Sequence, residues 1–216
     1  MQLKSLHKEY DRLQFLHGDL SLKSIYGAGC LKNPKIMFIF MNPTAKNVSA
    51  KEKWKGLRAP WLGTKNAWNI FYELNLLSKF SFDKIRIMKP EEWTTDFSNN
   101  VYSELNSNKI FVTNLAKCTQ LDARPLNNLV FKNYLDLMFK EIDLINPQNI
   151  ITFGNQVSSI LLEKKISVSN YKGIKNEILK IKNKAFKVYP TYYPVGQGRR
   201  NMPLAIQRIK KIITKK

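Results

Sequence analysis

The feature that most limits the possible folds is a set of short, mainly apolar runs that each end in a polar turn. Residues 36–41 read Ile-Met-Phe-Ile-Phe-Met and run into Asn-Pro. Similar runs at residues 110–115, 149–153 and 185–189 end near Thr-Asn, Gly-Asn and Pro-Thr-Tyr-Tyr-Pro. Short apolar runs are typical of buried parallel strands. Because the carboxyl ends of such strands meet at one edge, we expect a composite site there.

Helical periodicity separates these runs. We expect helices at residues 9–16, 66–77, 129–145, 156–164 and 203–213, with Thr64 as an N-cap of the second. Residues 46–58 read as a mobile loop, residues 172–189 as a basic hairpin or strand pair, and residues 79–108 have no firm assignment. The alternation predicts an α/β fold of three layers, α/β/α. Its centre is a short, mostly parallel four-stranded sheet, in one domain over residues 1–216.

The charge indicates the partner. The formal net charge is +20, and Glu177 is the only acidic residue between Lys164 and Lys216. A polyanion such as DNA or RNA is the usual partner of such a chain. The alternative explanation for the positive charge is the overall composition of the chain, since proteins rich in Lys, Asn and Ile occur in AT-rich genomes. No apolar run reaches the ~20 residues that cross a bilayer, so we expect no membrane and a cytoplasmic location, at the nucleoid in a prokaryote.

Four motifs lie beside the strand ends. They read Phe-Met-Asn-Pro-Thr (40–44), Arg-Ala-Pro-Trp-Leu-Gly (58–63), Val-Thr-Asn-Leu-Ala-Lys-Cys (112–118) and Thr-Tyr-Tyr-Pro-Val (191–195). In order and spacing the chain resembles the uracil-DNA glycosylase superfamily. The layout is similar to the iron–sulfur branch, and the Asn-Pro turn is similar to the single-strand-selective and mismatch-specific branches. The resemblance implies a monofunctional glycosylase that hydrolyses the N-glycosidic bond of uracil, or another deaminated base, flipped out of DNA and leaves an abasic site.

The resemblance assigns roles in the first two motifs. Asn42 would position the attacking water, with Met41 beside it in the base-binding turn. An oriented water can suffice because cleavage passes through an oxocarbenium-like state. Trp61 would stack on the extruded base, where the family has a phenylalanine, because a flipped base needs a flat partner. The alternatives are an ordinary Asn-Pro turn after a strand and a tryptophan of the core.

In the third motif, the resemblance assigns Asn114 to base recognition. An amide offers one acceptor and one donor, so it can pair with N3–H and O4 of uracil together. Cytosine presents the reverse pattern at those atoms. The alternative is an asparagine that satisfies backbone groups at a strand end.

The fourth motif departs from the family pattern. Tyr193 stands where the family has the histidine that stabilises the departing base. A tyrosine is a neutral donor with a pKa near 10, so we expect weaker or altered catalysis. Gln197 would fill the vacated base stack, and Arg199 and Arg200, with Lys46, would contact phosphates. One alternative function is a catalytically weak or inactive protein that binds damaged or single-stranded DNA, and a plain solvated basic turn is the other possibility.

The chain lacks the ligands of an iron–sulfur cluster. The family branch uses four cysteines, and this chain has two. Cys118 falls on a ligand position, but Tyr134 stands where a further ligand is usual, and Cys30 reads as a buried structural thiol. We therefore expect no metal and no cofactor. The expected partner is DNA, single- or double-stranded, containing uracil or another deaminated base, and the expected state is a monomer.

Overall fold

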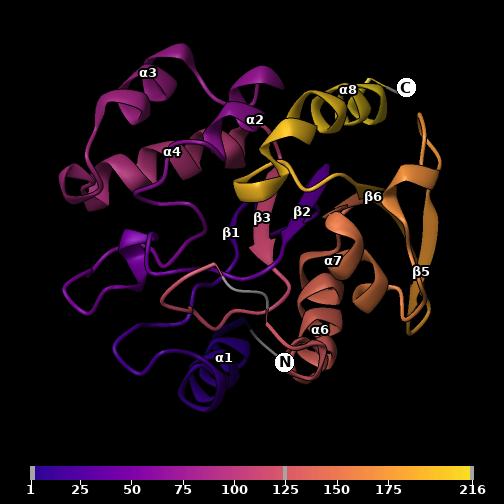
Figure 1. Cartoon of the computed structure of the whole chain (residues 1–216), viewed down its shortest axis with the longest axis horizontal. Helices are drawn as coiled ribbons and strands as arrows, with labels where there is room; N and C mark the ends of the chain where they lie inside the picture. The colour runs from indigo at the N-terminus through magenta and orange to yellow at the C-terminus, as the bar shows by residue number, and fades with distance from the viewer. Residues whose placement is uncertain (1–2, 124–125, 215–216) are drawn as a thin grey trace.

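The protein is built around one six-stranded sheet, seen near the centre of Figure 1. The computed structural model describes residues 3–123 and 126–214. The strand order is β1-β3-β2-β4-β6-β5. The strands are β1 (Ala28–Gly29), β2 (Ile36–Phe40), β3 (Ile110–Asn114), β4 (Asn149–Phe153), β5 (Glu177–Ile181) and β6 (Lys184–Thr191).

The four inner strands agree with the sequence prediction, and the number of strands does not. β3, β2, β4 and β6 are parallel neighbours, as expected for buried apolar runs. Two antiparallel strands extend the sheet to six: β1 beside β3, and β5 beside β6. The prediction of four strands was therefore wrong. β1 has only two residues, which is too short for an alternating pattern. β5 and β6 form the hairpin that was expected over residues 172–189.

Helices cover both faces of the sheet, which confirms the three layers (Figure 1). In the view of Figure 1 one group lies above the sheet and the other below it. The upper group is α2 (Trp68–Glu73), α3 (Lys79–Ile87), α4 (Thr95–Ser107) and α8 (Met202–Ile213). The lower group is α1 (Leu3–His17), α5 (Asn128–Asn133), α6 (Leu135–Ile145) and α7 (Gly154–Leu161).

Side chains alternate between two cores along each inner strand. Phe38 and Phe40 face the upper core with Phe153, whereas Met37 and Ile39 face the lower core. The strands are buried on both sides because every position enters one core or the other, which explains why they read as continuous apolar runs. No helix in residues 3–123 and 126–214 is long and apolar enough to span a membrane.

Several helix boundaries differ from the prediction. α2 begins at Trp68 with Ala67 as its N-cap, so Thr64 does not cap it. The helix expected over residues 129–145 is broken into α5 and α6 at Tyr134. Residues 79–108, left without an assignment, form α3, a short turn η2 (Pro90–Glu92) and α4. Periodicity cannot locate a break between two helices that continue the same apolar face.

The loop expected to be mobile is packed in its middle. Residues 48–50 form a buried turn, η1 (Val48–Ala50). Asn47 is buried; its side-chain oxygen accepts from the backbone N–H of Ser49, and its amide donates to Ala59 O at 2.8 Å. A polar loop can therefore be ordered. Here the side chain of Asn47 bonds to backbone groups that have no partner in regular secondary structure.

Candidate active site

The predicted strand ends lie level with one another at one edge of the sheet. Phe40, the last residue of β2, pairs with Asn114, the last of β3. Phe153, the last of β4, pairs with Thr191, the last of β6. The rings of Phe40 and Phe153 stack with centroids 4.4 Å apart, which ties the two pairs together. We call this edge, with the turns that leave it, the rim.

The turn after β2 is tied to the segment after β3. Met41 O accepts from Ala116 N at 3.0 Å, and Pro43 O accepts from Gln120 N at 3.1 Å. Asn42 is half-buried, and its amide nitrogen donates to Pro43 O at 3.2 Å. This bond leaves the side-chain oxygen of Asn42 as an acceptor for a ligand or a water molecule.

Met41 lies apart from the other predicted base contacts. Its side chain packs against the lower core, with Ile39. Trp61 and Tyr193 pack against the upper core instead. The side chain of Met41 and those two rings are therefore on opposite faces of the sheet, so at the rim Met41 offers backbone atoms beside Asn42.

Trp61 occupies an unusual backbone conformation. Its φ is +68°, in the left-handed region that a bulky residue rarely adopts. Its carbonyl accepts from Thr64 N at 3.0 Å, from Thr64 Oγ1 at 2.7 Å and from the indole N–H of Trp68 at 3.2 Å. Strained residues persist where surrounding contacts impose them, and such positions cluster at functional sites. Thr64 therefore fixes the Trp61 turn instead of capping α2.

The indole of Trp61 lies against the end of β2. Its ring meets Phe40 edge to face, with centroids 4.9 Å apart and planes at 76°. Its Nε1 is buried and has no hydrogen-bond partner among the described residues. Arg58, which precedes the turn, forms two hydrogen bonds to Asp11 of α1 at 2.9 and 3.1 Å. The turn is thus held firmly while a buried donor stays unpaired.

Asn114 is a buried amide without a protein partner. The residue is 2% exposed, and its side chain forms no hydrogen bond within residues 3–123 and 126–214. It pairs with Phe40 in a parallel ladder, so both side chains point to the same face of the sheet, the face of Trp61. Buried amides are nearly always bonded. An unbonded one at a strand end therefore marks a position that a ligand can satisfy.

Tyr193 follows β6 and lies against the first residue of α7. A Cβ built on Gly154 would lie 3.4 Å from the Cβ of Tyr193, and one on Gly198 would lie 2.1 Å from the Tyr193 carbonyl oxygen. Gly154 also has a φ of +87°, which favours glycine. Burial raises the pKa of Tyr193 to about 12. In the described structure its hydroxyl has no hydrogen-bond partner, so at neutral pH it is a free, neutral donor.

The sequence reading did not single out Gly154. It is the residue after β4, and β4 lies between β2 and β6, the strands that carry Asn42 and Tyr193. Having no side chain, it adds no bulk to the rim between those two turns. A glycine directly after a buried strand was the available signal, but it was read as the start of the helix alone.

The basic turn lies directly after Tyr193. Residues 196–201 form a short helical turn, η4 (Gly196–Asn201), that leads into α8. Arg199 and Arg200 are exposed on it, as is Lys46 in the loop after β2. Gln197 belongs to η4 by its backbone, and its side chain lies outside what the structure describes. The exposed guanidinium groups of Arg199 and Arg200 therefore lie on the helical turn that follows the rim.

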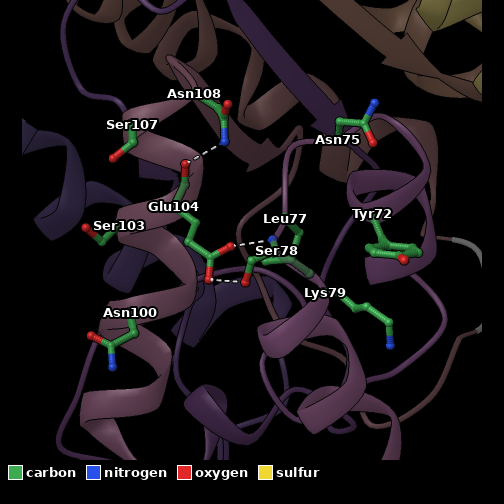
Figure 2. Close-up of a pocket in the computed structure, with 10 residues that line it drawn as sticks. All are labelled: Tyr72, Asn75, Leu77, Ser78, Lys79, Asn100, Ser103, Glu104, Ser107 and Asn108. Carbon is green, nitrogen blue, oxygen red and sulfur yellow. Dashed lines mark hydrogen bonds between the residues drawn. The ribbon is translucent and has the colours of Figure 1, made fainter.

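A hollow lies elsewhere, between α4 and the turn from α2 to α3 (Figure 2). It has a volume of 640 Å³. Its central carboxylate, Glu104, accepts from the backbone N–H of Ser78 at 2.6 Å and from its hydroxyl at 3.0 Å. Ser81 Oγ also donates to Glu104. This carboxylate is already bonded within the protein, so the hollow presents no unpaired buried group.

The cysteines do not fit a metal cluster. Cys30 follows β1, and its backbone N–H donates to Ile110 O at the start of β3, whereas Cys118 lies beyond the end of that strand. Within the described residues, no group of three or more His, Cys, Asp or Glu side chains is placed to hold a metal ion. The donor set therefore does not fit an iron–sulfur cluster.

Comparisons with known proteins identify the family of the chain. Residues 26–213 match the family model of the uracil DNA glycosylase superfamily. The chain therefore belongs to the uracil DNA glycosylase superfamily. Over 104 residues it is 31% identical to a protein of Sulfurisphaera tokodaii named type-4 uracil-DNA glycosylase. That match covers 43% of this chain and 43% of the relative, so it spans less than half of either protein.

Proposed function

We propose that the protein is a DNA glycosylase that hydrolyses the N-glycosidic bond of uracil, or of another deaminated base, flipped out of DNA. The observation that carries the proposal is the group of unpaired polar atoms at the rim. The indole N–H of Trp61 is buried without a partner in the described residues, the side chain of Asn114, a residue 2% exposed, forms no hydrogen bond there, and Tyr193 has a free hydroxyl. Family membership and the net charge of +20 support a nucleic-acid substrate.

Each rim residue has a chemical task in this proposal. The side-chain oxygen of Asn42 holds a water molecule for attack on the sugar carbon C1′. Trp61 stacks on the extruded base and replaces part of its lost stacking, ~1–3 kcal/mol. Asn114 accepts from N3–H of uracil and donates to O4, which satisfies the amide that the protein leaves unbonded.

Bond cleavage leaves negative charge on the departing base. The C1′–N1 electron pair stays with uracil, the water oxygen forms the new bond to C1′, and the proton that this oxygen loses finally neutralises the uracil anion. Tyr193 donates its hydroxyl to the uracil anion, and the raised pKa keeps it protonated well above neutral pH. A neutral donor stabilises an anion less than an imidazolium does, so we expect a slow enzyme.

In this proposal, positive charge beside the rim holds the DNA. Arg199, Arg200 and Lys46 are exposed on two turns that leave the same edge of the sheet. We propose that they contact phosphates on either side of the flipped nucleotide, with Gln197 in the vacated stack. The protein would act as a monomer, in the cytoplasm.

The test is a base-release panel. Oligonucleotides containing uracil, hypoxanthine or xanthine are incubated with the wild-type protein and with Asn42→Ala, and abasic sites are cleaved with alkali. We expect release by the wild type, with uracil among the released bases, and little release by Asn42→Ala. No release from any oligonucleotide by the wild type would overturn the proposal.

A second function is favoured by one observation, the tyrosine at position 193. The same site without turnover would be a protein that binds damaged or single-stranded DNA. Tyr193→His separates the two. Wild-type binding that prefers uracil-containing DNA without base release, with release gained in Tyr193→His, identifies a binding protein. Measurable release by the wild type identifies an enzyme.

A further inference from the structure

A buried ion pair lies directly beneath the rim. Lys117 is 0% exposed, and its ammonium donates to Asn114 O at 2.6 Å and to Glu141 Oε2 at 2.7 Å. Its third donor is directed at Thr113 Oγ1. Thr113 Oγ1 donates in turn to Glu141 Oε2 at 3.2 Å. All three ammonium donors are therefore used, and one of them ends on the backbone of Asn114.

Burying an ion pair in a protein core costs free energy. Removing both charges from water carries a large desolvation cost, and apolar residues of similar size often replace buried pairs without loss of stability. Burial lowers the pKa of Lys117. Stability alone therefore gives no reason for Lys117 and Glu141 at this place.

The position of the network gives a better reason. Asn114 is the last residue of β3, so its carbonyl lies where the regular ladder of the sheet ends. Its side chain has no partner in the described part of the chain that would fix it. Without Lys117 the carbonyl would be unpaired as well, and the backbone would be held only by the ladder beside it, where Leu115 N donates to Phe40 O at 2.8 Å. The ion pair therefore supplies the hydrogen bond that fixes the backbone of Asn114.

We propose that Lys117 and Glu141 are positioning residues that hold Asn114 so that its free amide is directed at the base. Glu141 fixes the ammonium from α6, and the ammonium fixes the carbonyl of Asn114. The inference rests on the proposed function, because it assigns base recognition to Asn114. It adds two residues that do not touch the base but determine how well Asn114 selects it.

The chain offers a matched control on the other side of β2. Ile39 pairs with Thr113 on β3 and with Thr152 on β4, so the two threonines flank the same residue. Thr152 Oγ1 and Ser158 Oγ, both buried, are 2.8 Å apart and hydrogen-bonded. This pair has no bond to Asn114. Its removal tests the effect of losing a buried polar contact at the same level of the sheet.

The experiment compares two double variants. Lys117→Met/Glu141→Leu removes both charges together, and Thr152→Val/Ser158→Ala is the control. Release of uracil is measured for each, alone and combined with Asn114→Ala. We expect kcat/KM to fall about tenfold in the Lys117/Glu141 variant but less than threefold when Asn114 is already alanine, because coupled residues are not additive. We expect the control to lose less than about threefold in either background.

A second readout does not depend on activity. The side-chain amide of Asn114 is followed by NMR in the wild type and in both double variants. We expect one sharp pair of amide proton signals in the wild type and the control, and broadened or doubled signals in the Lys117/Glu141 variant. If the wild type releases no uracil, the proposed function fails and this readout still tests the positioning.

Two outcomes would overturn the inference. One is an equal loss of kcat/KM with and without Asn114. The other is an unchanged amide signal in a folded Lys117/Glu141 variant. If that variant does not fold, Thr113→Val replaces it under the same criteria, since it removes one link and neither charge.

Discussion

The rim of the sheet and the hollow beside α4 differ in how their polar groups are satisfied. In the hollow, Glu104 is bonded to Ser78 and Ser81 of the α3 N-terminus. At the rim, the indole N–H of Trp61 is buried with no partner in the described residues, and the side chain of Asn114, a residue 2% exposed, forms no hydrogen bond there. The hollow is a clear cavity whose carboxylate is satisfied, whereas the rim carries polar groups without hydrogen-bond partners.

This difference indicates where a ligand is needed. A carboxylate that caps a helix stabilises the fold and is already satisfied. A buried amide without a partner carries a cost that only a ligand, or water, can remove. Buried hydroxyls without a partner in the described part of the chain also occur in the lower core, at Tyr10 and Tyr134, so unpaired groups indicate this site only together with the motifs at the strand ends. Substitutions in the two regions should separate activity from stability.

The largest expected effect on activity comes from Asn42→Ala. Loss of the group that orients the attacking water should lower kcat by ~10²–10⁴-fold. Single-turnover release of uracil measures it. Asn100→Ala, an exposed asparagine that lines the hollow, is the matched control and should leave kcat unchanged. Equal losses in both variants would remove the distinction between the regions.

The next largest effect on activity is expected from Asn114→Ala. Two lost hydrogen bonds to the base predict a fall in kcat/KM of about 100-fold, at roughly 1.5 kcal/mol for each bond. The free energy of unfolding should change by less than about 0.5 kcal/mol, because the amide has no protein partner to lose. Denaturant unfolding and base release together check this. A large loss of stability would contradict the view of Asn114 as a free amide.

Substitutions of Trp61 separate its ring from its backbone. Trp61→Ala and Trp61→Gly both remove the stacking surface, so both should weaken binding of uracil-containing DNA by about 30-fold. Trp61→Gly should be the more stable of the two by about 1 kcal/mol, because alanine is strained at a positive φ. Fluorescence titration and thermal unfolding measure the two effects. Equal stability of the two variants would argue against strain at this turn.

Tyr193→Phe should have a smaller effect on activity and a specific effect on pH dependence. Losing one donor to the departing anion predicts about a tenfold fall in kcat. The pKa of Tyr193 is raised to about 12, above the value near 10 of an unfolded chain. The stability from its neutral form is therefore complete below pH 10 and is lost between pH 10 and about 12.

Urea unfolding from pH 9 to 12 measures this loss of stability. Part of the decline above pH 10 should be absent in Tyr193→Phe, whose phenyl ring has no proton to lose. Identical declines in the two proteins would show that Tyr193 is not buried as described. Activity near neutral pH should not depend on the ionisation of this hydroxyl.

The smallest effect on activity is expected from Glu104→Ala. The variant loses the carboxylate bonded to the α3 N-terminus, so the free energy of unfolding should fall by about 1–3 kcal/mol. Release of uracil under folding conditions should change by less than about twofold, since surface groups remote from a site seldom affect it. A strong loss of activity without loss of stability would show that the hollow contains groups needed for catalysis.

Much of the fold follows from the sequence because the inner strands are buried on both faces. The runs at residues 36–41, 110–115 and 149–153 are mainly apolar, so their positions were predicted to within one residue. The edges of the sheet were harder. β1 is two residues long and includes Gly29, whose φ of +107° brings its backbone close to Ile110 O. That contact depends on the fold and leaves no local pattern.

The site was predictable in part. Asn42, Asn114 and Tyr193 were assigned from motifs, and the ladder places the strand ends that carry them at one edge. The roles of these residues remain predictions. Lys117 lies within the third motif, yet nothing in the sequence pairs it with Glu141, which is 24 residues away and on α6. Such a partner is visible only once α6 is packed against the sheet.

The most direct test of the central claim is a titration of the protein with free uracil followed by NMR. We predict that the signals of the Asn114 side-chain amide and the Trp61 indole N–H shift together, because uracil bonds to the amide and stacks on the indole ring. Signals of Asn100 and Lys79 at the hollow should stay in place. Shifts at the hollow with none at Asn114 and Trp61 would contradict the account.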